Sequence, residues 1–202
     1  AWAQYKPAVE NAKSEFYAMR RNAEGESDPF SKVVAYGKAW QSGKKFLEKL
    51  EYARILNPQK EGAYAGDRRA VSEVLSLISA EQEKCTVYLA VNGDWGNIIS
   101  SSLSQTLSKN GFKVAKSQSE AAYTASAVIE NNAAGNDPIS IYPSLDLKIK
   151  SKGGKTVFSQ EVKIAQKTIA YSLENAQKKA FPILAEEADK AVSAGLSKKF
   201  GY

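Results

Sequence analysis

The sequence predicts an α+β protein in two parts, a helical region over residues 1–84 and an α+β domain over residues 85–202. Apolar residues recur at helical spacing through the first part, and from Thr86 the spacing changes to the alternation that is typical of strands. One strand–helix–strand unit is then followed by a run of strands and a closing helix. This β-α-β-β-β-β-α order predicts a mostly antiparallel sheet that is packed by helices on one face.

Two or three helices, packed as hairpins, are expected in the first part. The first covers Val9–Arg21. After a polar break, Asp28 caps a long second helix, which ends at Asn57 because the residue before a proline avoids helical geometry. Gly62–Gly66 is expected to be a loop, and Asp67 is expected to cap the third helix, which carries apolar residues at helical spacing.

The second helix carries two further features. Gly37 and Gly43 each cost about 1 kcal/mol relative to alanine inside a helix, so we expect them to allow close approach of a neighbouring helix. Tyr36, Trp40 and Phe46 are expected mostly in the core. The alternative is that they line an apolar pocket beside the helices.

The α+β domain is expected to begin with a strand at Thr86–Val91, a tight loop and a helix at Ile98–Lys109. Gly111 ends this helix in a left-handed conformation. Short strands are expected at Phe112–Val114 and Tyr123–Ile129, the second because its residues alternate.

A longer alternating segment, Ile139–Lys150, predicts one strand with a buried and a wet face. Pro143 within it indicates an edge position or a bulge. A Lys-Gly-Gly-Lys turn then leads into the returning strand, Thr156–Gln166, and the two strands form a hairpin. Ser172 is expected to cap the closing helix, which Pro182 should kink or split.

Histidine is absent from the 202 residues, and Cys85 is the one cysteine. Ser-His-Asp and Cys-His catalysis are therefore excluded, as are zinc sites that require histidine or several thiols. Lysine supplies 23 of the 28 basic residues. Arginine is the residue that reads bases and grips phosphates bidentately, so no nucleic-acid partner is expected. We expect no catalytic residue, no metal and no cofactor.

Five segments of the second part form a pattern, which the Lys-Gly-Gly-Lys turn and the alanine-rich closing helix complete. They are Val87–Val91, Gly93–Asn97, Ile98–Lys109, Asn110–Phe112 and Ser119–Tyr123. The pattern resembles the small α/β domain of bacterial cell-envelope proteins that is found in the N-terminal part of the translocation protein TolB and in curli-secretion-channel lipoproteins. The helical first part is not covered. The resemblance implies a protein that binds partners or assembles, without catalytic residues.

The resemblance also implies secretion by a signal peptide, to the periplasm or the outer membrane. The start of the chain, Ala1-Trp2-Ala3, resembles the end of a signal-peptide cleavage region, although an arbitrary chain start explains three residues equally well. We expect a non-enzymatic interaction or assembly module of the envelope, with an envelope protein as partner and a contact to anionic lipid or peptidoglycan. The alternative is a carrier of a small apolar or peptidoglycan-derived ligand.

The loop between the first strand and the next helix provides three candidate partner-binding residues, Asp94, Trp95 and Asn97. Backbone N–H groups at a helix N-terminus can bind an anion. Asp94 already places a negative charge there, so a structural turn with a helix cap is the alternative. Trp95, if exposed, is a natural anchor for a partner. The nearby serines 100–102 lack an adjacent base and are expected on the helix surface or in packing.

Lys148, Lys150 and Lys152 gather around the predicted hairpin and are the other candidate partner-binding residues. Clustered lysines can bind anionic lipid headgroups or another polyanion. Alternatively, they keep the protein soluble and protect an edge strand from pairing with another chain.

Overall fold

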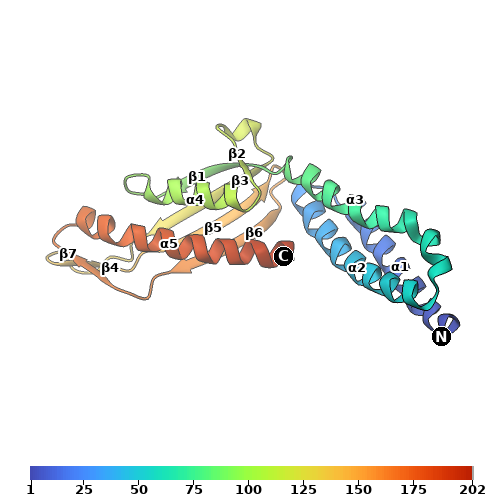
Figure 1. Ribbon diagram of the computed structural model, residues 1–202. Coiled ribbons are helices and arrows are strands. Elements are labelled where there is room, and N and C mark those ends of the chain that lie inside the picture. Colours follow the sequence, from blue (N-terminus) through green and yellow to red (C-terminus); the bar gives the residue numbers. More distant parts are fainter. Residues whose placement is uncertain (202) are drawn as a thin grey trace. The chain divides into compact units, whose positions relative to one another are not determined.

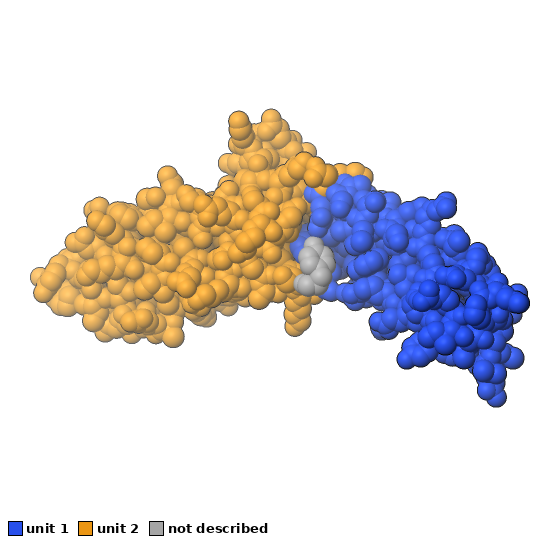
Figure 2. Space-filling model, viewed as in Figure 1, with its two compact units in different colours: residues 1–82, 200–202 blue, residues 83–199 orange. Residues whose placement is uncertain are grey.

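The computed structural model describes residues 1–201 and confirms the α+β fold class (Figure 1). The chain divides into two compact units (Figure 2): residues 1–82 with the last residues from Phe200 on, and residues 83–199. Within residues 1–201, no helix has both the length and the apolar character that a membrane crossing requires.

The helical unit contains α1 (Trp2–Glu24), α2 (Pro29–Leu56), the short 3-10 helix η1 (Pro58–Tyr64) and α3 (Ala65–Gln82). Asp28 caps α2 as predicted, since its carboxylate accepts a hydrogen bond from the backbone N–H of Ser31 at 3.0 Å. The helix also ends where expected, at the Asn57-Pro58 step. The prediction of a loop at Gly62–Gly66 is wrong, because these residues complete η1 and begin α3.

Gly43 allows the three helices to pack closely. A Cβ atom at this position would lie 2.7 Å from Cγ1 of Val71 in α3 and 3.2 Å from Cδ2 of Phe16 in α1. The first distance is too short for a carbon–carbon contact, and the second is tighter than most such contacts, so both neighbours would have to move. The predicted use of this glycine is therefore confirmed. Two aromatic residues of α2, Tyr36 and Phe46, are buried in this unit.

Asp67 lies inside the first turn of α3 rather than before the helix, which begins at Ala65. Its carboxylate accepts a hydrogen bond from the Tyr17 hydroxyl at 2.7 Å and lies 3.2 Å from Nζ of Lys13. Because Asp67 is only 9 % exposed, these contacts replace the hydrogen bonds to water that its carboxylate loses on burial. The residue therefore connects α3 to α1, a role that its sequence position alone does not indicate.

Two tyrosine hydroxyls in this unit donate to carboxylates, Tyr17 to Asp67 at 2.7 Å and Tyr64 to Glu10 at 3.0 Å. Burial, followed by these hydrogen bonds, raises the pKa of both tyrosines from 10.0 to about 12. The raised pKa stabilises the fold below pH 10, and this contribution is lost as the pH rises through 12. We expect an ultraviolet titration to find two tyrosines that ionise near pH 12.

Tyr17→Phe should remove one of these two late transitions and leave the other. If all ten tyrosines of the chain ionised near pH 10, the hydrogen bonds to Asp67 and Glu10 would be contradicted.

The α+β unit contains β1 (Thr86–Asn92), α4 (Ile98–Lys109), β2 (Lys113–Val114), η2 (Gln118–Glu120), β3 (Tyr123–Glu130), β4 (Ile139–Ile141), β5 (Ser144–Ser151), β6 (Thr156–Lys163), β7 (Thr168–Ala170) and most of α5 (Leu173–Phe200). The main sheet has the order β2-β1-β3-β5-β6. In it, β1 is parallel to both neighbours, whereas β5 is antiparallel to β3 and β6. As predicted, α4 and α5 lie over one face of this sheet (Figure 1).

The strand predicted at Ile139–Lys150 is two strands in two sheets. Pro143 separates β4 from β5, because proline has no N–H group to continue a ladder. β4 pairs with β7 in a separate two-stranded sheet, with Ile139 opposite Ala170. β7 was not predicted, since its three residues are too few for a period-two pattern to be detected.

The closing helix is continuous, so the predicted split at Pro182 is wrong. Ser172 caps it as expected, and its hydroxyl accepts a hydrogen bond from the backbone N–H of Asn175 at 3.2 Å. Phe181 and Leu184, on either side of the proline, are both fully buried. This packing offsets the one hydrogen bond that proline removes.

Candidate functional site

The main sheet has two different faces. Along β5, Leu145, Leu147 and Ile149 are buried on the side of the helices, and the residues between them are exposed or half-buried. β3 alternates in the same way. We call the second side the open face. From β3, β5 and β6 it presents Thr124, Ser126, Val128, Glu130, Ser144, Asp146, Lys148, Lys150, Ser159, Glu161 and Lys163.

The open face is hollowed by depressions of about 580, 490 and 480 Å³. Short serine and threonine side chains lie beside long charged ones on neighbouring strands, and this difference in length creates the depressions. The first lies between η2 and the β5–β6 turn, and the other two share Glu130, Ser144 and Glu161. The first depression is lined by Gln118, Ser119, Thr124, Ser126, Lys150, Ser151, Lys152 and Gly154.

Asp94 caps α4 by hydrogen bonding. Its carboxylate accepts hydrogen bonds from the backbone N–H groups of Trp95 at 2.8 Å, Ile99 at 3.1 Å and Ser100 at 2.8 Å, and from the Ser100 hydroxyl at 2.8 Å. The carboxylate therefore occupies the place at the helix N-terminus that a bound anion would take. Trp95 is half-buried, and Asn97 is exposed with a left-handed φ of 56°.

The six candidate residues do not form one site. Asp94, Trp95 and Asn97 follow the end of β1, whose last residue is opposite Val128 near the end of β3. Lys150 is opposite Thr124, at the start of β3. The two groups therefore lie toward opposite ends of the sheet, because β5 runs antiparallel to β3.

The three candidate lysines also differ in the charged groups that surround them. Nζ of Lys148 lies 3.3 Å from Oδ2 of Asp146, and both side chains are about half exposed. Lys148 borders a depression that Glu130 and Glu161 also line, whereas Lys150 and Lys152 line the depression without a carboxylate. The positive charge is thus concentrated at the η2 end of the open face.

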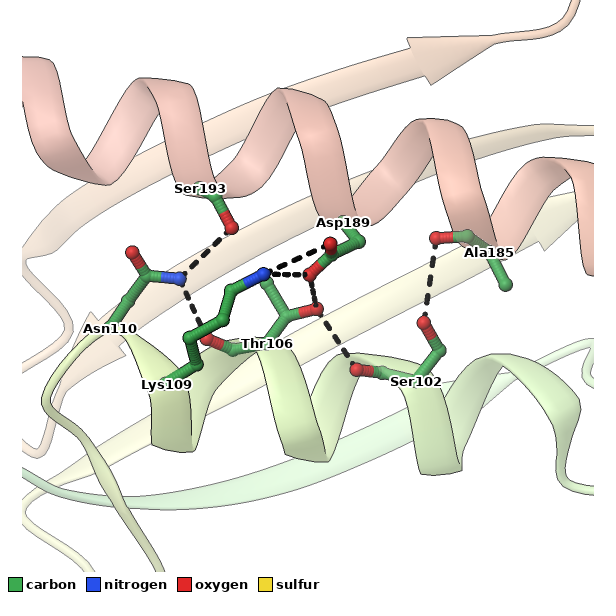
Figure 3. Close-up of polar contacts among 7 residues, drawn as sticks. All are labelled: Ser102, Thr106, Lys109, Asn110, Ala185, Asp189 and Ser193. Atoms are coloured by element: carbon green, nitrogen blue, oxygen red, sulfur yellow. Dashed lines mark hydrogen bonds and ion pairs between the residues drawn. The ribbon is translucent and has the colours of Figure 1, made fainter.

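A polar cluster that was not predicted joins α4 to α5 on the covered side of the sheet (Figure 3). Oγ1 of Thr106 lies 2.6 Å from Oδ1 of Asp189 and 2.9 Å from the carbonyl oxygen of Ser102. Lys109 donates to both oxygens of Asp189, at 2.9 and 3.0 Å. Thr106 is only 1 % exposed, so the cluster positions two helices and offers little surface to a ligand.

The cluster continues along both helices. Asn110 donates to the Ser193 hydroxyl at 3.1 Å, and the Ser102 hydroxyl donates to the carbonyl oxygen of Ala185 at 3.4 Å (Figure 3). The Ser102 hydroxyl therefore serves packing, as predicted, whereas the Ser100 hydroxyl takes part in the cap of α4, which was not predicted. Four of these contacts join residues 80 to 83 positions apart, and no local pattern in the sequence signals them.

Acid should weaken this cluster. Hydrogen bonds from Thr106 and then from Lys109 hold the pKa of Asp189 below its ordinary value of 3.8. A carboxyl group whose pKa is lower in the folded state stabilises the fold. This stabilisation is fully present when the pH lies above the ordinary pKa, and it is lost as the pH falls through the folded-state pKa. We expect Asp189→Asn to reduce the free energy of unfolding by about 1 kcal/mol at neutral pH and to have little effect below that pKa.

Denaturant titrations at neutral and strongly acidic pH test this expectation. Glu186→Gln is the matched control, since Glu186 is 69 % exposed and pairs with its helical neighbour Lys190; such a pair contributes little. An equal loss for Asp189→Asn at both pH values would contradict the assignment.

Within residues 1–201, no group of three or more histidine, cysteine, aspartate or glutamate side chains is arranged to hold a metal ion. Across the same range, every buried side-chain nitrogen or oxygen has a hydrogen-bond partner.

Comparison with known proteins finds similarity to solved structures. No family model matches the chain, and neither does any curated protein. Among solved structures, a candidate lipoprotein from Caulobacter crescentus CB15 is similar at 16 % identity with a TM-score of 0.42, covering 61 % of this chain and 98 % of its own. A minor lipoprotein from Acinetobacter baumannii is similar at 14 % identity with a TM-score of 0.37, covering 55 % and 94 %.

Proposed function

We propose that this chain is a non-enzymatic interaction or assembly module of the bacterial cell envelope, and that the open face is its contact surface for a partner protein. The observation that carries the proposal is the open face itself, where three depressions lie on one side of one sheet. Val128 is 45 % exposed there and is flanked on the paired strands by Asn92 and Asp146. An apolar centre with a polar surround is the usual arrangement of a protein interface.

The charges of the open face suit a partner with its own alternating charges. Asp146 and Glu161 are opposite each other on β5 and β6, and Ser144 is opposite Lys163. Complementary charges on a partner would determine its register on the face, and like charges would exclude the wrong partner.

Location in the envelope, in the periplasm or at the outer membrane, rests on the pattern of residues 87–202 that resembles the TolB and curli-secretion domains. Fractionation of the source cells tests this part of the proposal. We expect the protein in the periplasmic or outer-membrane fraction. Recovery from the cytosol alone would overturn it.

Site-specific photo-crosslinking tests the contact surface. A photoreactive residue at Val128 should form a crosslink to a partner in intact cells, and one at Glu186, which is exposed on α5, should not. Glu161→Lys should reduce the Val128 product several-fold, because a charge reversal on the face opposes the partner's charges. No product from Val128, or the same product from both positions, would overturn the proposal.

Trp95→Ala should weaken partner binding without unfolding the domain. The side chain is half-buried, and the hydrogen bonds of Asp94 hold the loop independently of the indole ring. The yield of the Val128 crosslink measures binding, and circular dichroism measures folding. Unchanged binding, or global unfolding, would assign Trp95 a purely structural role.

A further inference from the structure

We propose that the depression between η2 and the β5–β6 turn binds a phosphate group. We call it the lysine depression; it has a volume of about 580 Å³, within the usual range for a small-ligand pocket. Its floor contains Thr124 and Lys150, which are directly opposite each other on paired strands. This inference goes beyond the proposed function and requires no protein partner.

The lysine depression differs in charge from the other two on the same face. Its lining includes Lys150 and Lys152 and no carboxylate, whereas Glu130 and Glu161 line both of the others. An anion is therefore attracted to this end of the sheet and repelled from the rest of the face. A phosphate group carries between one and two negative charges near neutral pH and presents several acceptor oxygens.

The ammonium groups are available to such an anion. No hydrogen bond or ion pair engages the ammonium group of Lys150 within residues 1–201. The neighbouring Lys148, by contrast, pairs with Asp146 at 3.3 Å. Lys152 donates one hydrogen to the carbonyl oxygen of Ser119 at 3.3 Å, and this contact orients its ammonium group while two further hydrogens remain.

The hydroxyl groups of Thr124 and Ser151, which also line the lysine depression, can donate hydrogen bonds to the same anion. Oγ1 of Thr124 accepts a hydrogen bond from the Gln118 side chain at 3.3 Å, and Oγ of Ser151 accepts one from the backbone N–H of Lys155 at 3.2 Å. A hydroxyl that accepts still has its own hydrogen to donate. Two ammonium groups and two hydroxyls therefore belong to residues that line one depression, and such donors suit the acceptor oxygens of a phosphate.

Two probes distinguish the sources of the phosphate. Isothermal titration of the purified chain with inorganic phosphate tests a free phosphate. Flotation with vesicles of equal parts phosphatidylglycerol and phosphatidylcholine, against vesicles of phosphatidylcholine alone, tests a lipid headgroup. We expect saturable binding in at least one of these arms.

The variants separate a defined site from general surface charge. Lys150→Ala/Lys152→Ala should weaken binding about tenfold. Lys148→Ala/Lys163→Ala removes the same charge from the same open face and should leave binding within about twofold. Thr124→Val, which keeps the shape and removes the hydroxyl, should weaken binding several-fold. Circular dichroism checks that each variant is folded.

Absence of binding in both arms would overturn the inference, and so would an equal loss in the two lysine pairs, because that result indicates non-specific attraction. Binding lost only in the Lys150/Lys152 pair and in Thr124→Val supports it. Since these measurements use the purified chain, a negative result here leaves the crosslinking from Val128 as a separate test of the proposed function.

Discussion

Gly93→Ala is expected to lower the free energy of unfolding of the α+β unit by about 3 kcal/mol or more. The residue has a φ of +87°, where an L side chain costs about 1–2 kcal/mol. Its added Cβ would also lie 2.5 Å from the backbone oxygen of Ile129. That oxygen belongs to β3, in the middle of the main sheet, and cannot move without disturbing the strand pairing.

Gly154→Ala is the matched control. Gly154 has nearly the same φ, +85°, but an added Cβ there would meet nothing within 4 Å. This variant should lose only the conformational cost, about 1 kcal/mol. Denaturant unfolding can be followed by the fluorescence of Trp95, the single tryptophan within residues 83–199, when Trp2→Phe and Trp40→Phe remove the other two tryptophans. Equal losses in the two variants would contradict the close approach of Gly93 to β3.

This close approach also positions the candidate loop. Gly93 directly precedes Asp94, whose carboxylate caps α4 by accepting hydrogen bonds from the backbone N–H groups of Ile99 and Ser100. A displaced loop would weaken the cap, which contributes about 1 kcal/mol in typical cases. Gly93→Ala should therefore alter the surroundings of Trp95 as well as the stability of the unit.

Phe46→Ala is expected to lower the free energy of unfolding of the helical unit by about 3–5 kcal/mol. Phe46 is fully buried, and its ring centroid lies 6.4 Å from those of both Phe16 and Tyr64. Removing the ring leaves a cavity among α1, α2 and η1 that the surrounding helices can fill only in part. Denaturant unfolding followed by circular dichroism at a helix-sensitive wavelength measures the loss.

The same variant tests the alternative in which the aromatic residues of α2 line a ligand pocket. Tyr52→Ala, at a position that is 65 % exposed on the same helix, should cost less than about 1 kcal/mol. If Phe46→Ala were equally mild, and native mass spectrometry found a small apolar ligand retained by the unmutated chain, the carrier function would be favoured over a filled core.

Local signals in the sequence predicted most of the elements. The caps at Asp28 and Ser172 and the stop before Pro58 each depend on the chemistry of a few adjacent residues, and the structure agrees with all three. The change from helical to alternating spacing at Thr86 predicted where the sheet begins. These features are readable because the side chain that determines each one lies within a few residues of its effect.

The candidate site was less predictable. Lys148, Lys150 and Lys152 were recognised as a cluster because they are close in sequence. In the structure, Lys148 pairs with Asp146, whereas Lys150 and Lys152 line the depression beside η2. The pairing of β5 with β6 follows from the turn between them, but its pairing with β3 cannot be read from the sequence, because strand order and register are decided by contacts between distant segments.

The sequence by itself determined the α+β class, the order of the main elements and the exclusion of histidine chemistry, because periodicity, capping and composition act locally. Only the tertiary structure decided that Pro143 divides two sheets, that α5 continues through Pro182, and that Thr106 and Asp189 join two helices. It also decided that three depressions share one open face. Each of these features depends on the free energy of packing and hydrogen bonding between segments far apart in the chain, which outweighs local preference.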